Sequence, residues 1–167
     1  MTLLLDTSIL IGVERKEKKI IEKLNELKKI HFQPASISFI NYFEFYYGLI
    51  EKSIKNRQIM VNFINKFNCL KASSITAEIL AELKNKYEKK GIVIGLADLI
   101  IASQAKENNM LLVSTDGIFE KIDDINKIIT EISPFYKKKQ EPSHEHKLVY
   151  DSSSETLEPV YFWILDF

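Results

Sequence analysis

The chain has 167 residues, of which 46% are hydrophobic, so it can bury the core of one domain but is short for two. Its 23 Lys and Arg residues balance 23 Asp and Glu residues, which excludes the overall positive field typical of many nucleic-acid-binding proteins. The single cysteine, Cys69, excludes an intramolecular disulfide framework and a cysteine-rich zinc site.

The N-terminal apolar run does not have the features of a signal peptide. Asp6 interrupts it, and neither a basic leader nor a small-residue cleavage site accompanies it. No apolar stretch approaches the roughly 18 to 20 residues needed to cross a bilayer. We therefore expect no membrane segment, and the lone cysteine fits a reducing compartment, so we expect a cytoplasmic protein.

The start of the chain alternates short apolar runs with longer amphipathic stretches, which is typical of an α/β domain with a largely parallel sheet. Residues 3–5 predict a buried strand, and Thr7 or Ser8 can cap a short helix after it. Residues 14–29 then predict a helix, and residues 34–38 predict a second strand. The apolar stripe of that helix consists of Ile20, Ile21, Leu24, Leu27 and Ile30.

The alternation continues to about residue 132. Residues 39–50 and 53–67 predict a helical hairpin. Its second helix should turn Ile54, Met60, Val61 and Ile64 toward the core. The remaining predicted elements, in chain order, are a strand at 69–72, a helix at 76–89 that Gly91 ends, a helix at 96–108, a strand at 110–114, one helical turn at 118–121 and a strand at 125–132.

The C-terminal part of the chain changes character after Ser133. We expect residues 1–133 to form the domain and residues 134–158, rich in Pro, Ser, Lys and Glu, to form a polar linker. Residues 159–167 end in VYFWILDF, which is too apolar to remain comfortably in water. An isolated short segment has little stability of its own, so we expect it to dock on this chain or on another.

Two aspartates follow apolar strands of the predicted sheet. Asp6 ends the first strand, and Asp116 follows the apolar run MLLVS. The carboxyl ends of parallel strands face one crevice, where α/β proteins usually bind ligands. Each residue also has a simpler interpretation, Asp6 as a helix cap and Asp116 as part of an Asp-Gly turn.

Glu44 and Asp98 occupy unusual positions on their predicted helices. Ile40 and Tyr47 are the i−4 and i+3 neighbours of Glu44, which places this carboxylate on an apolar face. Asp98 is followed at i+3, i+4 and i+7 by an isoleucine and two alanines, a packing face of small residues. The simpler interpretations are a Glu head that reaches solvent and an Asp that favours a helix N-terminus.

These four carboxylates point to a metal if they converge. Their repulsion and desolvation would destabilise the fold unless a cation neutralises them. An all-oxygen set without Cys or a paired His suits Mg²⁺ or Mn²⁺ better than zinc. Carboxylate clusters with such ions recur in enzymes that cleave phosphodiesters, because the ions activate water and stabilise the attacking and leaving oxygens. The residue types therefore predict nuclease chemistry.

Three segments, taken in order, resemble the PIN-domain family and, within it, the toxin ribonucleases of VapC type. They are LLLDTSILI at 3–11, ISFINYFEFYYG at 37–48 and IGLADLIIASQAKENNMLLVSTDGIFEKI at 94–122. The resemblance covers about residues 2–132 and includes the spacing of 18 between Asp98 and Asp116. It implies a Rossmann-like, three-layer α/β/α sandwich with a central, mainly parallel sheet, and a Mg²⁺- or Mn²⁺-dependent endoribonuclease.

The resemblance also assigns the site. Asp6, Glu44, Asp98 and Asp116 match the acidic quartet of the family, in which three aspartates hold the metal and the glutamate ligates it or orients the attacking water. The hydroxyl side chains that match its neighbouring polar positions, and that can orient water or a carboxylate, are Thr7, Ser8, Ser114 and Thr115. Asn41 stands where relatives often carry Thr or Ser, a departure that leaves the metal set untouched.

The implied partners are an RNA substrate, a second copy in a homodimer and, for the toxin branch, a small antitoxin protein. Lys86, Lys89 and Lys90 precede the segment that leads to Asp98, and we favour them slightly as phosphate contacts, although solvated helix surface is the more ordinary interpretation. The aromatic residues between Tyr42 and Tyr47 can stack bases, but a core or dimer surface is the favoured interpretation.

We predict the toxin of a VapBC-type pair, and two alternatives stay open. One is a PIN-domain factor of RNA processing. The other is a non-catalytic module that binds RNA or a protein and uses the apolar C-terminal octapeptide for docking; the presence of all four acidic residues argues against it. Phosphotransfer on Asp6 is disfavoured, because DTSIL lacks the second nearby Asp of a DxD motif.

Overall fold

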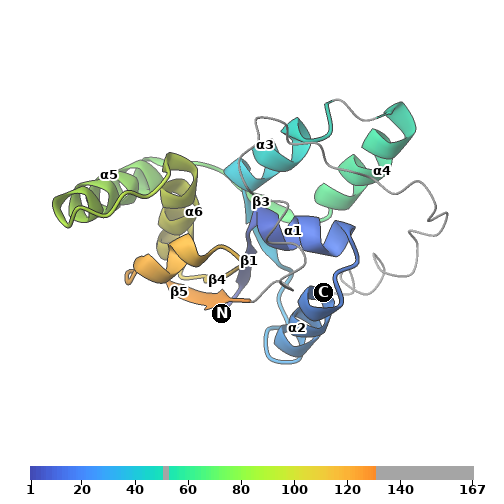
Figure 1. Ribbon diagram of the computed structural model, residues 1–167, viewed down its shortest axis with the longest axis horizontal. Helices are drawn as coiled ribbons and strands as arrows, with labels where there is room; N and C mark the ends of the chain where they lie inside the picture. The colour runs from blue at the N-terminus through green and yellow to red at the C-terminus, as the bar shows by residue number, and fades with distance from the viewer. Residues whose placement is uncertain (51–52, 131–167) are drawn as a thin grey trace.

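A single parallel sheet organises the chain. The computed structural model describes residues 1–50 and 53–130, so the predicted boundary after residue 133, the linker 134–158 and the segment 159–167 lie outside the described residues. The strands are β1 (Leu3–Leu5), β2 (Ser36–Ser38), β3 (Asn68–Leu70), β4 (Leu111–Ser114) and β5 (Asn126–Ile129). They pair in parallel in the order β3-β2-β1-β4-β5 (Figure 1).

Helices connect these strands on both sides of the sheet (Figure 1). They are α1 (Thr7–Glu14), α2 (Lys18–Lys28), α3 (Phe39–Tyr47), α4 (Ile54–Ile64), α5 (Ser74–Lys89), α6 (Leu96–Glu107) and the 3-10 helix η1 (Gly117–Lys121). Within the described ranges, none of these helices has the length and apolar character that crossing a membrane requires.

The side chains of β1 divide the interior into two cores. Side chains alternate along a strand, so Leu3 and Leu5 point to one face of the sheet and Leu4 to the other. Residues of α1, α2 and α4, with part of α3, pack on the first face, and residues of α5 and α6 pack on the second. The predicted three-layer α/β/α sandwich with a parallel sheet is therefore confirmed.

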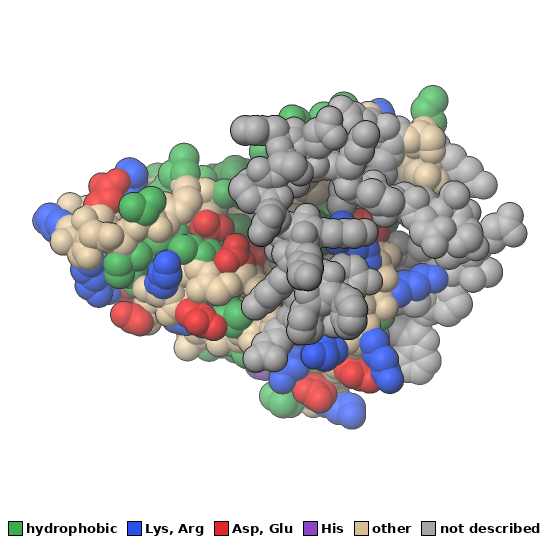
Figure 2. Space-filling view, in the orientation of Figure 1, with side chains coloured by type: hydrophobic (Ala, Val, Ile, Leu, Met, Phe, Trp, Pro, Cys, Tyr) green, Lys and Arg blue, Asp and Glu red, His purple; other side chains and the backbone are tan. Residues whose placement is uncertain are grey.

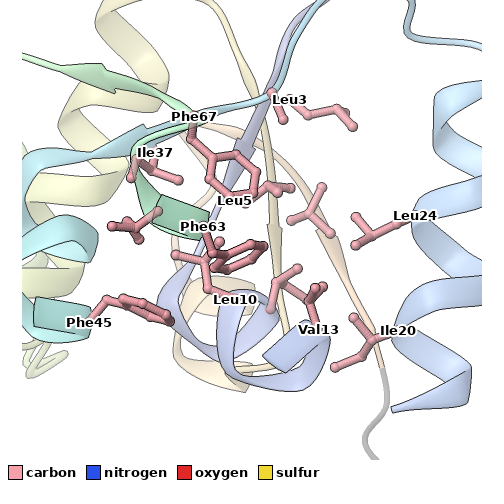
Figure 3. Packing of buried hydrophobic residues seen from close by; sticks show 14 of the residues in the cluster. Leu3, Leu5, Leu10, Val13, Ile20, Leu24, Ile37, Phe45, Phe63 and Phe67 are labelled. Atoms are coloured by element: carbon pink, nitrogen blue, oxygen red, sulfur yellow. The ribbon is translucent and has the colours of Figure 1, made fainter. Parts of the chain in front are cut away.

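Aromatic residues anchor α4 in the first core (Figure 3). The ring centroid of Phe63 lies 5.9 Å from that of Phe45 on α3 and 5.3 Å from that of Phe67, which meets it edge to face. Burying one such side chain is worth about 2–3 kcal/mol, so this trio holds α3 and α4 against the sheet.

The predicted helix at 14–29 is wrong in its boundaries. Glu14 is the last residue of α1, the short helix expected after Thr7 or Ser8, and α2 begins only at Lys18; Lys16 between them has a positive φ of 56°, which does not continue a right-handed helix. Two predicted core positions are also wrong: Ile30 is 69% exposed and Ile54 is 86% exposed. Ile30 lies beyond the end of α2, and Ile54 is the first residue of α4, so neither follows the buried stripe of its helix.

The strand order creates the place where a site can form. From β1 the chain moves to β2 and β3 on one side, whereas β4 and β5 lie on the other side. The carboxyl ends of β1 and β4 therefore flank the position where the direction of winding reverses, and this position is the usual ligand crevice of an open parallel sheet. Asp6 follows β1 directly, and Thr115 and Asp116 follow β4.

Candidate active site

Hydrogen bonds fix the carboxylate of Asp6 at the end of β1. Its Oδ2 accepts bonds from the hydroxyls of Ser8 at 2.7 Å and Ser114 at 2.8 Å, and its Oδ1 accepts one from Asn41 Nδ2 at 3.2 Å. Asp6 is the N-cap of α1, because its side chain also accepts from the Ser8 N–H at 3.4 Å; this agrees with the simpler interpretation of Asp6, whereas the expected cap at Thr7 or Ser8 is wrong. The residue thus caps the helix and presents a buried carboxylate at the crevice.

The hydroxyls of Ser8 and Ser114 join the ends of β1 and β4. The Ser8 oxygen accepts a bond from the Thr115 N–H at 3.1 Å, and the Ser114 oxygen accepts one from the Asp116 N–H at 3.0 Å. Both hydroxyls donate to Asp6, so the two strand ends and their acidic residue form one network. Thr115 takes part through its backbone, whereas the prediction considered its hydroxyl.

Glu44 extends from α3 to the start of α1. Its Oε2 accepts a bond of 2.6 Å from the hydroxyl of Thr7. Burial raises the pKa of Glu44 above its ordinary value, the Thr7 bond opposes that rise, and the negative charge of Asp6 adds to it. One reason for its prediction was wrong, since the neighbouring Tyr47 is exposed; Glu44 is half-buried at the margin of the helix.

Asn41 is a component of this network whose role the sequence interpretation missed. Its side chain is fully buried, and its Oδ1 accepts a bond of 2.9 Å from the Ser38 N–H. Its Nδ2 donates to Asp6 and, at 3.0 Å, to the hydroxyl of Thr7. Ser38 and Asn41 form a capping box at the start of α3, and that spacing was the available signal.

Asp98 lies in the first turn of α6, where burial and the other three carboxylates act on its pKa. Burial and the negative charges of Asp116, Asp6 and Glu44, in that order, raise its pKa from 3.8 to about 6. A hydrogen bond with the Gly95 backbone opposes this rise. Ile101, Ala102 and Ala105 are buried, as the small-residue face of this helix predicted.

Asp116 has a more exposed position than the other three acidic residues. Its Oδ1 accepts a bond of 2.9 Å from the Ile118 N–H and so caps η1, which agrees with the Asp-Gly turn interpretation. Its charge acts on Asp98 more strongly than that of Asp6 or Glu44. The residue is therefore both a local cap and part of the acidic group.

The donor chemistry of this acidic group fits a hard divalent cation. The group consists of the carboxylates of Asp6, Glu44, Asp98 and Asp116, and it offers oxygen ligands only. Within residues 1–50 and 53–130, no three Asp, Glu, His or Cys side chains approach closely enough to form a ready metal cage. Burial and, after it, the negative charges of the other three carboxylates raise the pKa of Asp98, and a bound cation would relieve that charge.

The three candidate phosphate contacts lie in different environments. Lys86 Nζ donates a bond of 2.7 Å to Asp124, which precedes β5 and so lies at the amino edge of the sheet, opposite Asp6. Lys86 is therefore held away from the acidic group. Lys90 lies 5.4 Å from the ring centroid of Tyr87, and Lys89 is exposed on the last turn of α5. On the face seen in Figure 2, basic and acidic side chains are interspersed over α5 and α2.

Comparison with known proteins decides the family. The family described as PIN domain matches residues 3–125. The chain belongs to the PIN-domain family. This PIN domain is also 28% identical over 116 residues to a protein named Ribonuclease VapC2 from Haemophilus influenzae, a match that covers 68% of this chain and 85% of the relative.

Solved structures agree with the fold of this PIN domain. A VapBC2 complex from Rickettsia felis, bound to a DNA fragment from its promoter, contains a chain that is 26% identical. That chain superposes with a TM-score of 0.69, and the match covers 78% of this PIN domain chain and all of the other. A DNA-bound VapBC from Salmonella typhimurium is 25% identical with a TM-score of 0.64, over 77% of this chain and 98% of its own.

Proposed function

We propose that this PIN domain is a divalent-metal-dependent endoribonuclease and the toxin of a VapBC-type toxin-antitoxin pair. The observation that carries the proposal is the effect of the charges of Asp116, Asp6 and Glu44 on Asp98, which supports a grouping of the four carboxylates near the crevice between β1 and β4. The name of its ribonuclease relative supports the activity. The VapBC complexes among its structural neighbours support the toxin assignment.

The proposed cleavage mechanism assigns a role to each of the four acidic residues. Asp6, Asp98 and Asp116 would hold Mg²⁺ or Mn²⁺, which when bound supplies charge neutralisation for the phosphodiester and lowers the pKa of water. The hydroxyls of Ser8 and Ser114 both donate to Asp6 Oδ2 and so orient this carboxylate.

Glu44 is the proposed acceptor of the proton from the attacking water. Its pKa is raised by burial, which brings it closer to neutral pH and makes it a better base than an exposed glutamate. The Thr7 hydroxyl fixes Glu44 Oε2 and leaves its other oxygen for water. In-line attack would leave a 5′-phosphate and a 3′-hydroxyl, the products implied by the family.

RNA cleavage in Mn²⁺ or Mg²⁺ tests this proposal. Asp6→Asn and Asp98→Asn should each lower the cleavage rate by about 100-fold or more, because each removes a charge that the metal and the transition state need. Asp123→Asn is the matched control, since Asp123 is exposed and precedes the amino edge of β5. Undiminished cleavage by folded Asp6→Asn and Asp98→Asn variants would remove the proposed site.

The proposed biological partners are RNA, a second copy of this PIN domain and a small antitoxin protein, all in the cytoplasm. The toxin assignment has its own test, because a small reading frame next to this gene should encode a protein that binds the domain and suppresses cleavage. Purified product of such a frame should reduce cleavage at an equimolar ratio. An active nuclease that no neighbouring product inhibits would favour a role in RNA processing.

A further inference from the structure

One helix face of the described structure is aromatic and unusually exposed. Six side chains from α3 and the turn after it line a shallow hollow of about 300 Å³; they are Phe39, Tyr42, Phe43, Tyr46, Tyr47 and Ile50. Phe43 is 60% exposed, Tyr47 66% and Ile50 51%. Contiguous exposed apolar surface of this kind usually marks a binding site. We call these six side chains the aromatic groove.

Stacking within α3 keeps the aromatic groove ordered. The rings of Tyr42 and Tyr46 stack with their centroids 6.2 Å apart, and those of Phe43 and Tyr47 stack with their centroids 5.9 Å apart. Tyr42 also donates a hydrogen bond of 3.2 Å to Asn65, which follows α4. Because the rings support each other in i, i+4 pairs, a ligand can bind without first ordering them.

The aromatic groove by itself has the size of a site for a short segment. A stable interface between folded proteins uses about 20–30 residues on each side, whereas the groove has six. The helix from Phe39 to Tyr47 is about 13 Å long at 1.5 Å per residue.

The chain itself contains a segment of suitable chemistry. Residues 160–167, VYFWILDF, lie outside the described residues and are apolar except for Asp166. Their aromatic side chains suit a surface built of Phe and Tyr, because offset and edge-to-face ring pairs add about 0.5–1.5 kcal/mol each beyond the burial of area. Docking would remove the apolar surface of the segment and that of the aromatic groove from water.

The connection is long enough for docking within one molecule. Residues 131–159 lie between the described domain and this segment, and a chain of that length can span about 30 Å. A domain of this size has a radius of gyration of about 14 Å, so the segment can reach any face. Tethering supplies an effective concentration on the order of millimolar, at which even a weak contact is occupied.

We propose that residues 160–167 dock into the aromatic groove of α3 in the same molecule. The inference goes beyond the proposed nuclease function and does not depend on it. It assigns an intramolecular partner to the exposed face of the helix that also carries Glu44.

The fluorescence of Trp163 tests the docking directly, because it is the only tryptophan of the chain. In the full-length protein at micromolar concentration, we expect blue-shifted emission and acrylamide quenching several-fold weaker than that of free tryptophan. Tyr47→Glu and Phe43→Glu should shift the emission to the red and restore quenching, because each places a charge in the groove. Phe32→Glu, at another exposed aromatic residue, is the control and should leave the emission unchanged.

A second variant keeps the test valid if a groove variant fails to fold. Leu165→Glu lies in the segment itself and should expose Trp163 while circular dichroism of the domain stays unchanged. Solvent-exposed Trp163 in the wild type, or shielding that survives Tyr47→Glu in a folded variant, would overturn the proposal. So would shielding that appears only at concentrations where gel filtration shows dimers, since a second copy would then supply the segment.

Discussion

The buried amide of Asn41 ties the start of α1 to the start of α3. It satisfies the Ser38 N–H and also donates to Asp6 and to Thr7. Through Thr7 it supports Glu44 as well. An amide side chain can do this because its acceptor oxygen and its donor nitrogen are separate atoms. A hydroxyl has one oxygen, which cannot reach the same three partners. Asn41 therefore positions two of the four carboxylates without belonging to them.

Asn41→Ala should lower the free energy of unfolding by about 2–3 kcal/mol, because it leaves a buried N–H and a buried carboxylate oxygen without their partner. Urea denaturation in the presence of EDTA measures this change. Asn85→Ala, on the exposed face of α5, is the control and should stay within about 0.5 kcal/mol of the wild type. A loss of less than 0.5 kcal/mol for Asn41→Ala would show that water can replace the amide.

Gly95 brings the backbone close to the carboxylate of Asp98. A Cβ atom at Gly95 would lie 2.8 Å from Asp98 Oδ2, which is shorter than the contacts that a real Cβ makes. The backbone at Gly95 is in the extended region, so close approach, and not a positive φ, explains the glycine. The carboxylate must move if a side chain is added there.

Gly95→Ala should weaken Mn²⁺ binding by about tenfold, equivalent to about 1.4 kcal/mol, because it displaces one proposed ligand. Isothermal titration with Mn²⁺ measures the affinity. Gly117→Ala is the matched control, since a Cβ at Gly117, next to Asp116, meets nothing within 4 Å. Equal affinities for the two variants would show that Asp98 does not need its present position.

At the scale of elements, the junction of α1 and α2 determines how these two helices pack in the first core. Gly12 of α1 is buried, and a Cβ there would overlap the Cδ1 atom of Ile20 on α2. Lys16 reverses the chain between the two helices with its positive φ. Ile20 and Leu24 of α2 therefore lie in the first core together with Leu10 and Val13 of α1 (Figure 3).

Gly12→Ala should destabilise the domain by about 1–3 kcal/mol through overpacking. Ile20→Val removes Cδ1 and by itself should cost about 0.5–1.5 kcal/mol. In the Gly12→Ala background the same Ile20→Val change should instead restore stability, because it removes the overlap. A double-mutant cycle from denaturant unfolding gives the coupling, and additive effects would contradict the close contact.

At the scale of the whole molecule, the strand order concentrates negative charge at one edge of the sheet. The pKa of Asp98, raised to about 6, means that the folded state holds its proton more tightly than the unfolded state does. Stability from this group is therefore present at low pH and is lost as the pH rises through about 6. Metal-free protein near neutral pH carries this cost, and bound Mg²⁺ or Mn²⁺ would remove it.

In EDTA, Asp98→Asn should therefore become more stable relative to the wild type between pH 5 and pH 7.5, by about 1 kcal/mol once the half-exposure of the group is considered. Thermal unfolding at the two pH values measures this difference. Mn²⁺ should raise the melting temperature of the wild type more at pH 7.5 than at pH 5. If the stability of Asp98→Asn relative to the wild type does not change with pH, then neither burial nor the other carboxylates raise the pKa of Asp98.

Much of the fold could be predicted from local patterns. Five apolar runs became five strands, and the helices after β2, β3 and before β4 lie within a few residues of their predicted ranges. Where prediction failed, it misplaced an element boundary: Glu14 was expected to begin the second helix, but it ends α1, and Lys16 with its positive φ separates α1 from α2. Ile30 and Ile54 are likewise exposed because Ile30 lies beyond the last residue of α2 and Ile54 is the first residue of α4.

The amino-acid sequence by itself determined the family, the alternation of strands and helices, and the identity of the four acidic residues, because residue type and spacing are local properties. Tertiary structure decided what these residues can do together. It placed β1 beside β4, buried Asn41 between Asp6 and Thr7, and brought the charges of Asp116, Asp6 and Glu44 close enough to raise the pKa of Asp98. Those effects depend on distances between residues far apart in the chain, which only the folded backbone sets.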